Sequence, residues 1–64
     1  MKLPELAEVT TAEQARDIAI DWQHWSSDQT MYQSELIEYA EYFQALADKF
    51  GADLTEEFKE NGII

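Results

Sequence analysis

The chain has no cysteine, few basic residues and no long apolar run. Without cysteine, neither a disulfide framework nor a thiolate metal site can form, so helix packing has to stabilise the fold. No segment approaches the roughly 20 apolar residues of a membrane span, and residues 1–6, with one basic residue and no apolar run, do not resemble a signal peptide. We therefore expect a cytoplasmic protein.

The scarcity of basic residues leaves a large negative charge. Four lysines and arginines stand against fourteen acidic residues, and the formal net charge is −10. Affinity for nucleic acid comes from basic side chains that neutralise phosphates, so direct binding to nucleic acid or to an anionic membrane is disfavoured. We expect a partner that is a cation or a basic protein surface, unless the charge serves only solubility.

Signatures of catalysis are also missing. The chain has no glycine-rich phosphate loop and no calcium-binding loop, and its serines form no triad with the single histidine, His24. A helical chain of 64 residues offers little concavity to enclose a substrate. We predict that the protein is not an enzyme and has no cofactor.

A first helix is predicted from about residue 11 to residue 27. Thr10 and Glu13 have the spacing of a capping box, and a polar run at residues 26–30 ends the helix. Residues 1–10 form an irregular segment, the lead-in, with room for a short helical turn. Side chains at helical spacing form one stripe that we expect to be buried: Ala12, Ala15, Ile18, Ala19, Trp22, Trp25 and Ser26.

A second, longer helix is predicted from residue 31 or 34 to residue 50. Gly51 suits the left-handed position that ends a helix, and Lys49 complements the negative end of the helix dipole. Its apolar stripe comprises Tyr32, Leu36, Tyr39, Ala40, Phe43, Leu46, Ala47 and Phe50.

A short third helix completes the predicted fold. Asp53 or Thr55 can cap its start, and Asn61 and Gly62 stop it. Leu54, Phe58 and Ile63 then pack back on the two longer helices. The prediction is a single all-α domain over residues 1–64, with an antiparallel helical hairpin and a C-terminal third helix.

Acidic side chains lie opposite the apolar stripe on both long helices. Residues four apart rise about 6 Å along a helix axis, close to the roughly 6–7 Å between successive phosphates of a strand. Carboxylates at this spacing can imitate a phosphate row, and the alternative is a solvated face. The acidic candidates for a protein-binding site are Glu13, Asp17, Asp21, Glu38, Glu41 and Asp48.

Two apolar residues complete the candidate site, because they fall outside the stripes. Ile20 lies among acidic residues, although the lead-in or the third helix is an equally good cover for it. Tyr42, like Ile37, can contact the third helix, a second subunit or a partner. Either Ile20 or Tyr42 is a possible apolar anchor of a binding face.

One metal-binding pattern is weakly present. Asp21, His24 and Asp28 fall along one helix face, but they lack the further converging ligands of a metal site. We predict no metal site, and a divalent-cation binder is kept only as a third possibility.

Three segments carry a resemblance to known proteins, namely 21–27 (DWQHWSS), 38–43 (EYAEYF) and 54–64 (LTEEFKENGII). They resemble short acidic proteins encoded by phages, plasmids and conjugative elements of Gram-positive bacteria, and the resemblance covers most of residues 11–64. It implies a protein that acts in the bacterial host cell. Small acidic proteins of such elements are often counter-defence factors, for example anti-CRISPR or anti-restriction proteins.

Two functional hypotheses follow. In the first, the anionic helix faces bind and block the basic DNA or RNA site of a nucleic-acid-handling enzyme, such as a CRISPR or restriction nuclease. In the second, the protein is a homo-oligomeric or adaptor module whose working surface is apolar, with Ile20, Ile37, Tyr42 or Trp25 buried between chains.

Overall fold

The computed structural model describes residues 1–64 and contains only helical elements. A 3₁₀ turn, η1 (Leu6–Glu8), lies in the lead-in. Three α-helices follow: α1 (Ala12–Ser26), α2 (Gln33–Phe50) and α3 (Ala52–Glu60). The prediction of a small all-α fold with two long helices and a short third one is confirmed.

The start of α1 is one residue later than predicted. The capping box consists of Thr11 and Gln14, not Thr10 and Glu13: the Thr11 hydroxyl accepts from the Gln14 N–H at 3.1 Å, and Gln14 Oε1 accepts from the Thr11 N–H at 3.2 Å. Both pairs have the same spacing. The later pair is favoured because Gln14 Oε1 also accepts from the Thr10 N–H at 2.8 Å.

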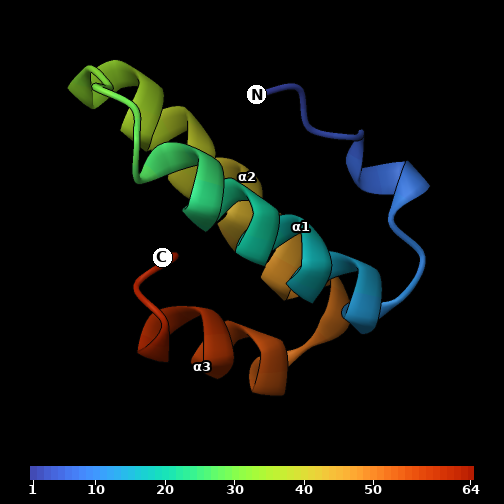
Figure 1. The fold of residues 1–64 in the computed structure, drawn as a ribbon. Coiled ribbons are helices and arrows are strands. Elements are labelled where there is room, and N and C mark those ends of the chain that lie inside the picture. Colours follow the sequence, from blue (N-terminus) through green and yellow to red (C-terminus); the bar gives the residue numbers. More distant parts are fainter.

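Aromatic rings join α1 to α2. The Trp22 ring lies 5.3 Å from both the Tyr39 and the Phe43 rings, and Trp25 lies 6.1 Å from Tyr39. A later residue of α1 thus contacts the earlier residue of α2, and the two helices run antiparallel (Figure 1). Small buried side chains on α1, Ala15 and Ala19, permit this close approach. The buried Trp22 indole N–H has no hydrogen-bond acceptor within the protein.

A single residue, Gly51, joins α2 to α3. Its N–H donates to the Ala47 carbonyl at 2.9 Å, and its own carbonyl accepts from the Thr55 N–H at 3.2 Å. Gly51 is therefore both the C-cap of α2 and the N-cap of α3. The prediction that Asp53 or Thr55 caps α3 is wrong. Its φ of 105° is positive, as predicted, but its ψ of −175° differs from that of a left-handed helical residue.

The end of α3 agrees with the prediction. Asn61 caps the helix and Gly62 adopts a φ of 73°. The Gly62 N–H donates to the Lys59 carbonyl and the Ile63 N–H to the Phe58 carbonyl, at 3.2 and 2.8 Å, which is a Schellman motif. Ile63 and Phe58 are both buried, so the motif folds the end of the chain back onto the core.

The helical hairpin is covered on two sides. The lead-in runs along one side and α3 crosses the other (Figure 1). On the side of α3, the Phe58 ring meets the Phe43 ring edge-on, with the ring centres 5.9 Å apart. The ten buried residues, all apolar, are Val9, Ala15, Ala19, Trp22, Phe43, Leu46, Ala47, Leu54, Phe58 and Ile63.

Three residues in the first half of the α2 stripe are not buried as predicted, whereas Tyr39 packs against the core. Tyr32 is 77% exposed, Leu36 is 44% exposed and Ala40 is also exposed. The reason is length: α3 has nine residues and α2 has eighteen, so α3 covers only part of the hairpin. None of the helices combines the length and the apolar composition that crossing a bilayer requires.

Candidate functional site

The outer face of α1 carries a row of acidic side chains. Glu13, Asp17 and Asp21 are all exposed, and each lies about one helical turn, roughly 6 Å, from the next. None of them takes part in an ion pair, because the one salt bridge of the protein is elsewhere. We call these three residues the α1 row.

The one salt bridge lies on a different side of α1. Arg16 Nε is 2.6 Å from Glu57 Oε2 of α3, and both side chains are roughly 40% exposed. A pair so open to solvent contributes little to stability. It does, however, direct Arg16, the one arginine or lysine of α1, towards α3, so Arg16 does not neutralise the row.

The acidic residues of α2 lie on the other flank of the molecule. Glu38, Glu41 and Asp48 are exposed, and Asp48 Oδ1 accepts from Gln44 Nε2 at 3.0 Å. Since the buried stripes of α1 and α2 face each other through Trp22, the acidic residues opposite those stripes point away from each other. The six predicted acidic residues therefore form two separate faces, and one flat partner surface cannot contact both.

Ile20 is only partly covered. Its side chain is 48% exposed and lies beside a groove of about 170 Å³ between α1 and α3. Gln23 spans this groove, with its Nε2 2.8 Å from the Asn61 carbonyl oxygen. The lead-in lies on the other side of the hairpin, and α3 reaches only the edge of Ile20.

Tyr42 belongs to the internal packing. Its hydroxyl donates to the Pro4 carbonyl at 2.8 Å, and its side chain is partly buried under the lead-in. Burial, and secondly the carboxylate of Glu8, raises the pKa of Tyr42 above its ordinary value of 10. The contact was predicted to be with α3, a second subunit or a partner. The lead-in takes that place instead.

Lys49 also holds the lead-in, which the sequence did not predict. Its ammonium group donates to the carbonyls of Leu6 and Val9, both at 2.6 Å. Its predicted role was only to complement the helix dipole. Two of the four basic residues, Arg16 and Lys49, thus make internal contacts, and the outer surface is correspondingly more acidic.

A shallow groove of about 510 Å³, which we call the α2 groove, lies on the outer side of α2. Ile37 is 50% exposed in this groove, and the side chain of Ile64, which also lines it, is half-buried. The sequence identified Ile37 as lying outside the stripe, but it placed Ala40 in the core. The lining includes Ile37, Ala40, Ala45 and Ile64 as apolar residues and Glu41 and Asp48 as acidic ones.

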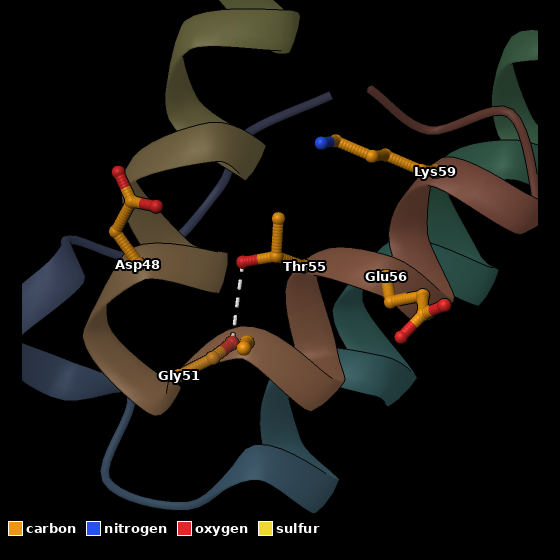
Figure 2. A pocket seen from close by; sticks show the side chains of 6 residues that line it. Asp48, Gly51, Thr55, Glu56 and Lys59 are labelled. Carbon is orange, nitrogen blue, oxygen red and sulfur yellow. Dashed lines mark hydrogen bonds between the residues drawn. The ribbon is translucent and has the colours of Figure 1, made fainter.

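The largest depression lies where α2 meets α3. Figure 2 shows that Asp48 and Glu56 point in opposite directions there, and that the Thr55 hydroxyl turns to the Gly51 carbonyl, 3.2 Å away. The hydroxyl therefore has no neighbouring base, and the carboxylates do not converge on a common point. We find no arrangement for acid–base or nucleophilic chemistry in this depression.

The acidic residues do not cluster around a metal position. No group of three His, Asp or Glu side chains is close enough to hold an ion. The predicted common helix face of Asp21, His24 and Asp28 is not formed, because α1 ends at Ser26 and Asp28 lies in the turn after it.

Comparison with known proteins gives no match. No protein-family model, no curated protein and no solved structure is significantly similar to this chain.

Proposed function

We propose that the protein is a non-enzymatic inhibitor that presents the α1 row to the basic nucleic-acid site of another protein. The observation that supports this most directly is the row itself: Glu13, Asp17 and Asp21 are exposed, unpaired and about one turn apart. Their spacing of about 6 Å is close to that of phosphates along a strand. The Lys and Arg side chains that bind a phosphate backbone would bind these carboxylates instead.

The acidic face of α2 matches a strand less well. Glu38 and Glu41 are three residues apart, and Asp48 follows only seven residues later. Ile37 and Ala45 lie within this face. The α1 row keeps a regular spacing of four residues, with Ile20 beside it. A partner that recognises a regular row of negative charge would therefore bind α1.

The resemblance to proteins of mobile elements supports a target in host defence. A CRISPR or restriction nuclease has the required basic site, and the bacterial cytoplasm is where the two proteins would meet. Occupation of that site would exclude the nucleic acid by mass action. Electrostatic attraction would also accelerate the encounter, and it would make both rate and affinity fall with added salt.

An interaction module with an apolar working surface is the second candidate. The observation that favours it is the exposure of Leu36 and Ile37, which are 44% and 50% exposed on neighbouring positions of α2. This candidate predicts binding that salt affects little. In its homo-oligomeric form it also predicts a dimer in sedimentation experiments.

The test is a tagged pull-down from the lysate of a Gram-positive host that carries CRISPR and restriction enzymes, at low and at high salt. A Glu13→Gln, Asp17→Asn, Asp21→Asn variant neutralises the α1 row. The matched control neutralises three charges on the other flank, with Glu38→Gln, Glu41→Gln and Asp48→Asn. Because both variants lose the same net charge, their difference reports the position of the charges.

We expect that the wild type and the α2 control each recover a DNA- or RNA-binding enzyme at low salt. The α1 variant should not recover this enzyme, and high salt should abolish its recovery. The purified enzyme should then bind nucleic acid less well when the wild-type protein is added. Equal recovery by the wild type and the α1 variant, with the same salt dependence, would refute the proposal.

A further inference from the structure

The α2 groove is an apolar surface that the rest of the chain leaves open. Ile37, Ala40 and Ala45 lie along it, and Ile64 lies at its edge because α3 returns the chain towards α2. The lead-in cannot cover the groove, since Lys49 and Tyr42 hold it on the other side of α2. The small side chains of Ala40 and Ala45 let a partner approach the helix closely.

The length of the groove matches a helical partner. From Ile37 to Asp48 the α2 axis rises about 16 Å, which corresponds to about three helical turns. Grooves of this kind bind amphipathic helices whose apolar side chains recur at i, i+3 or i+4, and i+7. Ile37, at one end of the groove, is its largest exposed apolar side chain, and it supplies the main apolar contact.

The charges at the groove select the partner. Glu41 and Asp48 line it and no basic residue does. The bond from Gln44 Nε2 to Asp48 Oδ1 fixes that carboxylate beside the groove. A second copy of this chain would bring the same acidic residues together, with a charge of −10 on each copy, so homodimerisation through this face is opposed.

We infer that the α2 groove binds an amphipathic helix with a basic flank, its apolar side against Ile37 and its Lys or Arg residues against Glu41 and Asp48. This surface is separate from the α1 row and faces the other flank, so the inference stands or falls without the proposed function. A protein that carries both surfaces can hold two different partner elements at once.

The test uses synthetic peptides with a fluorescent label, and their anisotropy is measured against the full chain. The first peptide is helical, with leucines on one face and lysines on both flanks. A second has glutamates in place of the lysines, and a third has the composition of the first with its leucines distributed around the helix. Ile37→Ala removes the main apolar contact, and Ile20→Ala is the matched control, since Ile20 is 48% and Ile37 50% exposed.

We expect only the first peptide to bind, and Ile37→Ala to weaken its binding about tenfold, as truncation of an apolar anchor residue of an interface does. Ile20→Ala should leave affinity unchanged, and amide resonances of the wild type should shift along residues 37–48. Equal binding of the third peptide, equal weakening by Ile20→Ala, or shifts confined to α1 would each overturn the inference. So would a wild-type dimer that Ile37→Ala dissociates, because the groove would then bind a second copy.

Discussion

The substitution Gly51→Ala tests the junction that sets the direction of α3 relative to α2. Gly51 has φ 105° and ψ −175°, a backbone conformation that essentially only glycine adopts. An added Cβ would meet no atom within 4 Å. The effect of the substitution therefore comes from the backbone alone and not from a clash.

The expected cost follows from this conformation. Holding a residue with a side chain in so sparsely populated a region costs about 1–3 kcal/mol. Alanine also restricts the unfolded chain, which returns about 0.4–1 kcal/mol. For a domain of this size, each kcal/mol corresponds to about 4–8 °C in the midpoint of thermal unfolding. We expect Gly51→Ala to lower the midpoint on the order of 10 °C.

Gly62→Ala is the matched control. Gly62 also has a positive φ, 73°, and also has open space around its Cβ position. Its φ is nearer that of a left-handed helical residue, a conformation that costs a residue with a side chain about 1–2 kcal/mol. Thermal unfolding followed by circular dichroism should thus rank the wild type above Gly62→Ala and Gly62→Ala above Gly51→Ala. A Gly51→Ala protein as stable as the wild type would refute the backbone argument.

Two further predictions concern the lead-in. Lys49→Met removes the two hydrogen bonds to Leu6 and Val9, so proteolysis within residues 1–10 should accelerate, whereas Lys59→Met should leave the rate unchanged. The pKa of Tyr42 is raised in the folded state above its ordinary value of 10, so the neutral phenol stabilises the fold fully below pH 10. This stabilisation is lost as the pH rises through the folded-state pKa. Urea unfolding should show this alkaline loss in the wild type and a smaller one in Tyr42→Phe, and identical pH profiles would contradict it.

The helices could be predicted from the sequence because their signals are local. Thr11, Gly51 and Gly62 each lie at or next to a helix end, and the apolar spacing between these ends is regular. The errors at the ends are also local. Two threonines each fit a capping box, and a glycine that usually follows a helix here also precedes one.

The surfaces could be predicted less well because they depend on contacts between distant residues. Lys49 lies about forty residues from the carbonyls that it binds, and no sequence pattern pairs an ammonium group with backbone oxygens. The exposure of Leu36 and Ala40 depends on how far α3 extends over the hairpin. The acidic residues were identified correctly as exposed, but their division into two faces follows from the antiparallel packing of Trp22 against α2.

The α1 row destabilises its own helix, and this effect gives a test of whether the row binds a partner or only keeps the protein soluble. Like charges four residues apart in a helix destabilise it by about 0.2–0.5 kcal/mol per pair, and the row contains the two pairs Glu13/Asp17 and Asp17/Asp21. Glu13 recovers part of this cost because it lies in the first turn of α1, at the positive end of the dipole. Asp21 has no such compensation.

If the row is a binding surface, Asp21→Asn should both stabilise the protein and weaken its complex with the partner, because a residue kept for binding is not optimised for stability. If the row serves solubility alone, the same substitution should stabilise the protein and leave every complex unchanged.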